Sequence, residues 1–347
     1  MSDNPTMGET GGEFAFLQRV LEPTEETCND PLPGAASVII GPSTAFDGAL
    51  LQFNGQVVAT TDMLADGRHF RLDWINPYEC GWRAGIASIS DCAALGARPK
   101  VGFLSLGIPK DLPAKDAEAI VLGVKESLEN YGAFLGGGDT IAVDGPVIIN
   151  VCLLGESCGR VVGRGGAKVG DLICVTGKLG GSRGAIMCLE NLGREQAWND
   201  YYSLVKCYSM PHARVDAGVW LSSQPNVHAM MDISDGLSSD LRHFAQSGGV
   251  GIVLQPKKLP YHPELGAALE VTSESPFITA MHGGEDCELV FAIDPDKADG
   301  FLSDLLVWGS AQGTIVGRVV EQLGVWYEDD MGMTLPLQQI GFEHFPA

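Results

Sequence analysis

The sequence predicts a mixed α+β fold in two domains. The chain has 347 residues, and 45% of them are hydrophobic, so two domains can each bury a core. Apolar runs with strand spacing and with helix spacing occur in both halves, separated by Glu156–Gly170, which is rich in Gly and Arg. We therefore expect a mobile polar tail over residues 1–12, an N-terminal domain over 13–156 and a C-terminal domain over 157–347.

Apolar spacing and turn residues place the elements of the first half. A helix is expected over 13–21, then strands over 37–40, 49–53 and 56–60, with Asn54-Gly55 closing a hairpin between the last two. Pro77–Leu95 is predicted as a helix because Asn76 can cap it, Pro77 suits its first turn and Gly96 can end it. The rest of a layered sheet with helices on one face follows: strand 101–108, helix 114–131, a strand entering at 134–135, and a fully buried strand over 147–154.

The second half mixes both periods again. We expect helices over 182–191, 213–222 and 236–247. Strands are expected over 172–176, 229–233, 251–254, 289–293 and 313–318. Strands and helices alternate without an internal repeat, so this domain is predicted to be a layered α/β structure.

Charge and cysteine content narrow the class of function. The formal net charge is −22, which argues against broad contact with nucleic acid or an anionic membrane, although acidity can also serve solubility alone. Nine cysteines form no CxxC pair, so we interpret them as reduced thiols of a cytoplasmic protein. Neither a signal peptide nor an apolar run of about 18 residues is found, and membrane insertion is not expected.

Five short segments place aspartates beside small residues, often at the end of an apolar run. Carboxylates gathered at one place repel each other unless a cation lies among them, and Mg²⁺ prefers oxygen ligands. No GxSxG motif or distinctive cysteine offers a nucleophile, and phosphoryl transfer needs none. The sequence thus predicts a magnesium-bound phosphate compound, handled by Phe46-Asp47-Gly48, Thr60-Thr61-Asp62, Ile89-Ser90-Asp91, Gly136-Gly137-Gly138-Asp139-Thr140 and Asp232-Ile233-Ser234-Asp235-Gly236.

Each segment also has a structural interpretation. Asp62 can hold a metal at a strand end or cap the next turn, and Asp91 opposes the dipole of its helix unless a cation is near. The glycine run before Asp139 can bring backbone N–H groups to phosphate oxygens or form a plain turn; it is neither a Walker A loop nor a GxGxxG fingerprint. One acid of the Asp232–Asp235 segment is expected to cap the following helix.

Three further groups could bind substrate. Arg160, Arg164 and Lys168 form a basic patch that can meet a nucleotide phosphate or lie in a solvated linker. The segment Gly283-Gly284-Glu285-Asp286 precedes a strand and can hold a substrate group. His69 can line a pocket with Phe70, although a lone histidine more often serves packing.

In order and spacing these segments resemble the thiamine-monophosphate kinase family, which belongs with aminoimidazole ribonucleotide synthetase and selenophosphate synthetase. The similarity runs nearly end to end. It is carried by Gly12-Glu13-Phe14, Thr61-Asp62-Met63-Leu64, Gly67-Arg68-His69-Phe70, Ile89-Ser90-Asp91-Cys92-Ala93-Ala94-Leu95-Gly96-Ala97, Gly137-Gly138-Asp139-Thr140, Gly165-Gly166-Ala167-Lys168-Val169-Gly170-Asp171, Val175-Thr176-Gly177, Asp232-Ile233-Ser234-Asp235-Gly236-Leu237, Gly283-Gly284-Glu285-Asp286-Cys287-Glu288-Leu289 and Gly341-Phe342-Glu343-His344-Phe345.

The resemblance implies transfer of the ATP γ-phosphate to thiamine monophosphate, with several Mg²⁺ ions and no covalent enzyme intermediate. It implies a two-domain aminoimidazole ribonucleotide synthetase-like architecture, in which the first domain pairs with a second copy as a closed β-barrel, so a homodimer is expected. By motif, the metal ligands would be Asp47, Thr60, Thr61, Asp62, Asp91, Asp139, Asp232 and Asp235. The nucleotide contacts would be Gly138, Arg164 and Ser234, and the acceptor contacts His69, Glu285 and Phe342.

The chain departs from the family pattern at three places. Phe46 replaces the first acid of a Gly-Asp-Asp, Ile141-Ala142 replaces a Thr-Arg, and Cys287 replaces the Tyr of Glu-Asp-Tyr-Glu-Leu. We expect activity to survive because Asp47, Asp62, Asp91 and Asp139 remain. Two alternatives stay open: an enzyme of the same superfamily with another acceptor, and a protein that binds nucleotide or thiamine phosphates with weak turnover.

Overall fold

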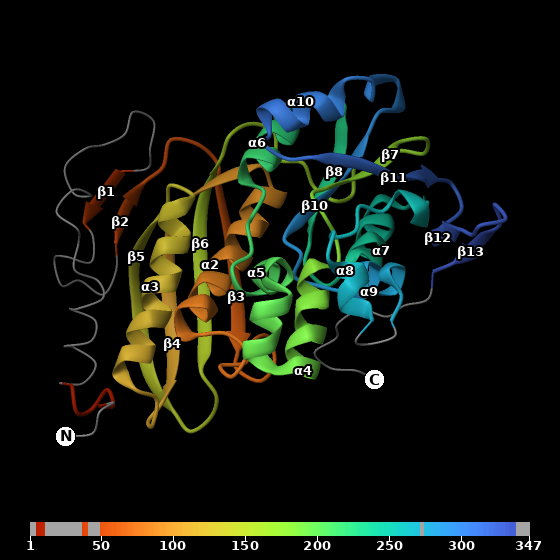
Figure 1. Ribbon diagram of the computed structural model, residues 1–347. Helices are drawn as coiled ribbons and strands as arrows, with labels where there is room; N and C mark the ends of the chain where they lie inside the picture. The colour runs from red at the N-terminus through yellow and green to blue at the C-terminus, as the bar shows by residue number, and fades with distance from the viewer. Residues whose placement is uncertain (1–4, 11–36, 41–48, 271–273, 338–347) are drawn as a thin grey trace. The chain divides into compact units, whose positions relative to one another are not determined.

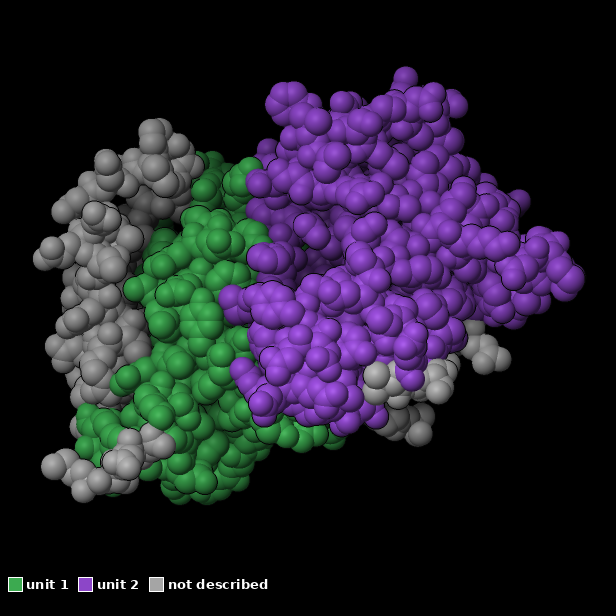
Figure 2. Space-filling model, in the orientation of Figure 1, with its two compact units in different colours: residues 1–92, 98–157 green, residues 93–97, 158–347 purple. Residues whose placement is uncertain are grey.

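The computed structural model describes residues 5–10, 37–40, 49–270 and 274–337. The helix expected over 13–21, and the candidate residues Asp47 and Phe342, lie outside this part of the chain. Two compact units are present, Met1–Cys92 with Arg98–Ser157 and Ala93–Ala97 with Cys158–Ala347, and Figure 2 shows them in green and purple. Of the expected tail, residues 5–10 are described, and Pro5 O accepts a 2.9 Å hydrogen bond from Ala114 N.

The first unit contains a four-stranded sheet in the order β3-β6-β4-β5 (Figure 1). Strands β3 (Val57–Ala65) and β6 (Ile148–Ser157) pair antiparallel along nine positions. Strands β4 (Ala97–Pro109) and β5 (Phe134–Val143) pair parallel. Within the described residues of one chain this sheet is open, and no closed barrel is found.

Helices α2 (Pro77–Ala94) and α3 (Ala114–Asn130) cover one face of this sheet. They approach closely because a glycine of each helix faces the backbone of the other: a Cβ on Gly81 would lie 1.9 Å from Ile120 O, and a Cβ on Gly123 would lie 2.0 Å from Tyr78 O. Every second residue of β6 is buried against the helices while the others are only half-buried. The expectation that this strand is buried on both sides was wrong, because helices cover only one side.

The predicted hairpin at Asn54-Gly55 was also wrong. Strand β2 (Leu50–Gln52) pairs with β1 (Ser37–Ile40) in a separate two-stranded sheet, and β3 pairs with β6. A three-residue β2 offers few backbone partners, whereas β6 offers nine, so the long-range pairing prevails over the turn preference. The turn instead places Asn54 N at 3.0 Å from Glu156 Oε1.

The glycine run, expected to be a turn or a loop, lies inside β5. The register with β4 shifts between Gly102 and Phe103, so the run carries a β-bulge. Glycine is required there because a Cβ on Gly136 would lie 2.4 Å from the Val101 side chain and one on Gly138 would lie 2.5 Å from Leu104 O. Strand pairing therefore uses the backbone that the sequence suggested as either a phosphate loop or a plain turn.

The second unit contains a seven-stranded mixed sheet in the order β13-β12-β9-β11-β7-β10-β8. Its strands are β7 (Leu172–Thr176), β8 (Val227–Ile233), β9 (Gly251–Leu254), β10 (Glu288–Ile293), β11 (Gly313–Val320), β12 (Gly324–Glu328) and β13 (Thr334–Pro336). Among the described strand pairs of this second sheet, β12 and β9 pair in parallel and the others pair antiparallel. The last two strands were not predicted.

Helices cover both faces of this sheet. On one face α7 (Leu237–Gly248) packs into a core with Val290 and Ala292. On the other face the ring of Phe291 lies near that of Phe301 in α10 (Phe301–Trp308), with centroids 6.4 Å apart. The centroid of the Phe301 ring also lies 4.9 Å from that of Trp220 in α6 (Val215–Ser223). All six residues of β10 are therefore buried.

The remaining helices surround the sheet ends. Helix α4 (Gly181–Asp200) is twice as long as predicted and bends at Gly193. The sequence missed α5 (Tyr202–Ser209), α8 (Leu265–Leu269), α9 (Pro276–His282) and α10. No helix in the described ranges is both long and apolar enough to cross a bilayer. The eight cysteines of the described part are free thiols.

Candidate active site

The first unit brings two of the predicted carboxylates together. Asp62 projects from the edge strand β3 towards α2, where Ser88 Oγ lies 2.8 Å from Asp62 Oδ2. One turn later on α2, Asp91 accepts a short hydrogen bond from Thr60 Oγ1. The same strand face therefore supplies Thr60 and Asp62, and one helix face supplies Ser88 and Asp91. The sequence missed Ser88, although its spacing of three residues from Asp91 puts both on one helix face.

The electrostatics of this pair favour a cation. Burial, and then the negative charge of Asp62, raise the pKa of Asp91 to about 6, against a weaker opposing effect of the Thr60 hydrogen bond. Burial and the same two carboxylates raise the pKa of Cys92 to about 12, so this thiol stays protonated at neutral pH. Thr60, Asp62, Ser88 and Asp91 all offer oxygen atoms as ligands, which suit a hard ion such as Mg²⁺. The residues therefore fit the metal that the sequence predicts.

Two other predicted ligands lie elsewhere in the first unit. Thr61 points to the opposite sheet face, where its Oγ1 accepts a 3.0 Å hydrogen bond from Asn150 Nδ2. Asp139 lies exposed on β5, three strand spacings from β3, which is about 14 Å at about 4.8 Å per strand. Two carboxylates on strands that far apart cannot share one ion. The described residues contain no group of three His, Cys, Asp or Glu side chains placed to hold a metal.

The second unit places Asp232 at the end of β8 and Asp235 in the loop that enters α7. Neither acid caps the helix, as the sequence predicted one would: the N-cap is Gly236, with φ 109° and no side-chain cap. Asp240, buried on the first turn, instead accepts a 3.1 Å hydrogen bond from Ser234 N. Burial, and then the charges of Asp232 and Asp235, raise the pKa of Asp240 to about 8. This loop is a second concentration of negative charge.

The segment that carries Glu285 lies directly against this loop. Glu285 N donates a 2.7 Å hydrogen bond to Ser234 O, and a Cβ on Gly284 would lie 2.5 Å from the same oxygen. Strand β10, which begins three residues later, pairs with β8 so that Leu289 faces Asp232. Glu285 and Ser234, which are 51 residues apart in sequence, thus lie on one surface. The sequence had assigned one to metal and nucleotide and the other to the acceptor.

All three residues of the basic patch are exposed, but two of them have partners. Arg160 Nη2 donates to Gln224 O at 2.9 Å and to Val227 O at 2.7 Å, so it anchors the chain before β8. Lys168 Nζ lies 3.1 Å from His228 Nε2, and the other nitrogen of that ring lies 2.9 Å from Asp171. Arg164 makes no hydrogen bond or ion pair with the described residues, so it is the member of the patch available to a phosphate.

His69 has a structural contact in the first unit. Its Nδ1 accepts a 3.1 Å hydrogen bond from Ala65 N, which closes the turn after β3. The ring is half-buried. The contact with Ala65 N is the packing role that a lone histidine more often has.

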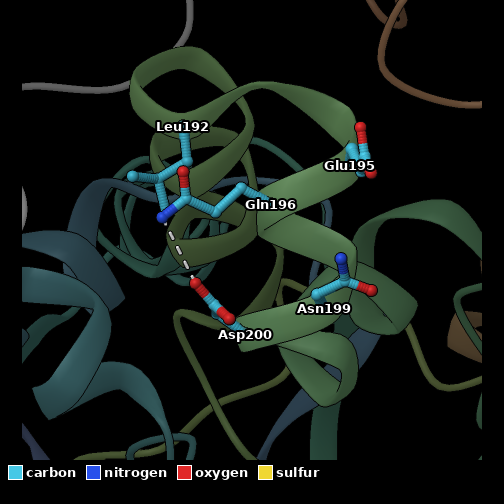
Figure 3. Close-up of a pocket in the computed structure, with 5 residues that line it drawn as sticks. All are labelled: Leu192, Glu195, Gln196, Asn199 and Asp200. Atoms are coloured by element: carbon cyan, nitrogen blue, oxygen red, sulfur yellow. Dashed lines mark hydrogen bonds between the residues drawn. The ribbon is translucent and has the colours of Figure 1, made fainter.

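An open hollow of about 360 Å³ lies on helix α4, lined by Leu192, Glu195, Gln196, Asn199 and Asp200 (Figure 3). All five residues come from one helix, and Gln196 Nε2 donates a 3.3 Å hydrogen bond to Asp200 Oδ2. None of the residues that the sequence singled out takes part. We therefore do not assign the hollow to the active site.

Comparison with known proteins gives the family of both halves of the chain. Residues 46–157 match the family model of the AIR synthase related protein N-terminal domain, and residues 168–327 match that of its C-terminal domain. Thiamine-monophosphate kinase of Aquifex aeolicus is 34% identical over 96% of this chain and 98% of its own length.

The chain belongs to the thiamine-monophosphate kinase family. The fold agrees as well. The crystal structure of thiamine-monophosphate kinase from Stenotrophomonas maltophilia matches with a TM-score of 0.75, 31% identity, and coverage of 84% of this chain and 91% of that chain. A structure described as AaThiL complexed with AMPPCP and TMP matches with a TM-score of 0.73 and 30% identity, covering 99% of this chain and all of that one.

Proposed function

We propose that the protein phosphorylates thiamine monophosphate to thiamine diphosphate by direct, Mg²⁺-dependent transfer of the ATP γ-phosphate. Membership of the kinase family supports the reaction, and a relative of the same fold binds AMPPCP, an ATP analogue, together with TMP. The observation that carries the proposal in this chain is the 2.7 Å hydrogen bond between Glu285 N and Ser234 O. It joins the segment predicted to bind the acceptor to the segment predicted to bind metal and nucleotide.

The carboxylates would hold several Mg²⁺ ions. Thr60, Asp62 and Asp91 would serve one position in the first unit, and Asp232 and Asp235 another in the second. Asp139 would serve a separate ion, because its strand is too far from β3 to share one. Bound Mg²⁺ would neutralise phosphate oxygens and the charge that develops during transfer. Asp47 and Thr61 stay candidate ligands by motif, Thr61 through its backbone or from the other sheet face.

The chain's own groups would position both substrates for in-line transfer. Arg164 would pair with a phosphate of the nucleotide, which its exposed guanidinium can contact in a bidentate manner. Ser234 and Gly138 would contact the nucleotide, while His69, Glu285 and Phe342 would contact the acceptor. No protein nucleophile is needed, because holding the two phosphates in line provides most of the rate enhancement.

We also infer that the open face of the four-stranded sheet pairs with a second copy of the chain. On β3, Val57 is 47% exposed and Met63 is 63% exposed, and both lie on the face opposite to Asp62. Large apolar side chains on one sheet face are typical of an interface. Met63→Asp should convert the dimer to a monomer in analytical ultracentrifugation, because an interface carboxylate would lose its water. A wild-type monomer at micromolar concentration would contradict the inference.

The reaction is tested with purified protein, ATP, thiamine monophosphate and MgCl₂, measuring thiamine diphosphate by chromatography. We expect product with Mg²⁺ and none after chelation. Absence of product under metal-replete conditions would refute the proposal. Calorimetry with AMPPCP would then separate a weak binder from an enzyme that uses another acceptor.

The free cysteines of the described part also fit a reducing compartment such as the cytoplasm.

A further inference from the structure

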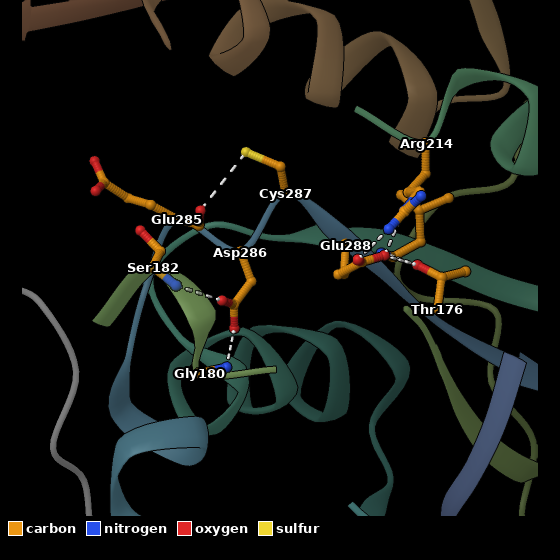
Figure 4. Close-up of polar contacts among 9 residues, drawn as sticks. Thr176, Gly180, Ser182, Arg214, Glu285, Asp286, Cys287 and Glu288 are labelled. Carbon is orange, nitrogen blue, oxygen red and sulfur yellow. Dashed lines mark hydrogen bonds and ion pairs between the residues drawn. The ribbon is translucent and has the colours of Figure 1, made fainter. Parts of the chain in front are cut away.

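Glu285, Asp286 and Cys287 alternate in backbone conformation, and their side chains point in different directions. Glu285 has φ 65° and Cys287 has φ 52°, in the left-handed region that residues other than glycine rarely occupy. Such conformations persist only where the surrounding contacts impose them. Asp286 lies between the two, and in Figure 4 its carboxylate points to α4 while the Glu285 side chain extends the other way.

The Asp286 carboxylate is held at the start of α4. Asp286 Oδ2 accepts a 2.9 Å hydrogen bond from Gly180 N, and Oδ1 lies 3.4 Å from Ser182 N. These N–H groups belong to the first turn of a 20-residue helix and have no partner within it, so an acid is favoured there. Asp286 thus fixes the segment from one side without occupying the substrate-facing side.

A buried ion pair fixes the other end of the segment. Glu288, 4% exposed, receives hydrogen bonds from Arg214 Nε at 2.6 Å and from Thr176 Oγ1 at 2.6 Å. Thr176 Oγ1 in turn accepts a 2.8 Å hydrogen bond from Leu289 N. The two acids that follow Glu285, Asp286 and Glu288, are therefore both anchored to other parts of the second unit (Figure 4).

We propose that Asp286, supported by the Thr176–Glu288–Arg214 contacts, is a positioning residue that holds Glu285 in place for the phosphate acceptor. This inference rests on the proposed function, in which Glu285 contacts the acceptor. The nucleotide side has its own support, because Asp240 holds Ser234 N. Asp286 and Asp240 thus hold two adjacent segments. Asp286 would support the acceptor side, and Asp240 would support the nucleotide side.

Asp286→Asn is the main test. The amide places an NH₂ group against the N–H groups of α4, so the segment loses one acceptor and gains a repulsive donor. We expect KM for thiamine monophosphate to rise by about tenfold or more, because a lost hydrogen bond to a charged group typically changes an equilibrium constant by about that factor. KM for ATP should change by less than about twofold. Hydrogen exchange should speed up at the amide of Glu285.

Two further variants calibrate that result. Asp294→Asn is the matched control: Asp294 follows the other end of β10 and accepts a 3.0 Å hydrogen bond from Asp296 N at the surface. It should change neither KM nor exchange. Asp240→Asn should show the reverse selectivity and raise KM for ATP more than KM for thiamine monophosphate.

A pair of milder variants at Thr176 tests the proposal if Asp286→Asn does not fold. Thr176→Val removes the hydroxyl that contacts Glu288 and Leu289 N, and Thr176→Ser keeps it. The valine variant should raise KM for thiamine monophosphate and the serine variant should restore it. If both Asp286→Asn and Thr176→Val lower the melting temperature and leave that KM unchanged, these residues are merely structural and the proposal is wrong. Equal rises in both KM values would also overturn it.

Failure of the proposed function would be recognised separately. If the wild type makes no thiamine diphosphate, the reaction is wrong, and calorimetric binding of thiamine monophosphate replaces KM as the readout. Binding weakened about tenfold in Asp286→Asn, and not in Asp294→Asn, would support the positioning role without turnover. Equal binding by the two variants would refute it.

Discussion

The two sheets of this protein differ in how many faces they bury. In the four-stranded sheet, β3 and β6 alternate between residues buried under α2 and α3 and residues that stay exposed or half-buried. In the seven-stranded sheet, β9 and β10 are buried at every position because helices cover both faces. The second unit completes its core within one chain, whereas the first leaves a face that a second copy can cover.

The same contrast applies to the acids. In the first unit, Asp62 on the edge strand β3 and Asp91 on α2 repel each other, and this repulsion contributes to the raised pKa of Asp91. In the second unit, Asp240, Asp286 and Glu288 accept hydrogen bonds from backbone N–H groups or from Arg214. We expect Asp62 and Asp91, like Asp232 and Asp235, to need a cation, whereas Asp240, Asp286 and Glu288 hold loops in place. The predictions below test this distinction.

The largest expected effect is that of a charge placed in the fully buried sheet. Ala292→Asp puts a carboxylate at a position on β10 that is 0% exposed, so unfolding should become easier by more than about 4 kcal/mol. Met63→Asp, on the open face, should change the unfolding free energy of the single chain by less than about 0.5 kcal/mol, apart from the concentration-dependent stability that a dimer would add. Urea unfolding followed by circular dichroism measures both. Comparable losses would mean that the two sheets are equally closed.

Next is the metal ligand of the first unit. Asp62→Asn should lower kcat by about a hundredfold or more, because an amide cannot balance a divalent ion as a carboxylate does. Its fold should persist, since the amide can still bond Ser88. Asp73→Asn, which alters only an exposed pair with Arg71, is the matched control. A kcat within twofold of wild type would remove Asp62 from the metal site.

A smaller effect is expected from the buried ion pair of the second unit. Arg214→Met leaves Glu288 buried without its cation and should cost about 2 kcal/mol, less than a fully buried pair because Arg214 is 30% exposed. Lys110→Met breaks the exposed pair with Asp144 and should cost less than about 0.5 kcal/mol. Thermal unfolding of the two variants compares them directly. Equal costs would show that Glu288 is not held by the interior.

The smallest effect concerns pH and metal. The folded pKa of Asp91, about 6, is raised above its ordinary value of 3.8, so its protonated form adds stability that is complete below pH 4 and lost as pH rises through 6. Mg²⁺ binds the ionised form and should raise the melting temperature by a few °C at pH 7.5 and by about half as much at pH 5.5. Asp62→Asn should abolish most of this difference. A rise independent of pH would place the ion elsewhere.

Local sequence rules placed many elements well. Pro77, with Asn76 before it, starts α2 at the expected residue, and Asp91 and Asp232 lie near the expected helix and strand ends. The placement of Asp62 at a strand end was wrong, because β3 continues to Ala65 in its pairing with β6. These features depend on capping, proline geometry and apolar spacing within a few residues. The rules failed at Asn54-Gly55 and at the glycine run, where pairing with β6 and β4 prevailed.

The candidate site shows the same division. The sequence found Asp62, Asp91, Asp232 and Asp235 because clustered acids are visible without a fold. It did not find Ser88, Asp240 or the Arg214–Glu288 pair, whose partners are distant in sequence or hidden by helix turns. Contacts of this kind depend on strand register and helix packing.

The sequence by itself determined the α+β class, the family and the acidic segments, since composition, local spacing and motif order carry that information. Only the tertiary structure decided which acids meet: it separates Asp139 from Asp62 by the strand order and joins Glu285 to Ser234 through the pairing of β8 and β10. The physical reason is that backbone pairing and helix packing act between residues far apart in the chain, where local preferences carry little weight.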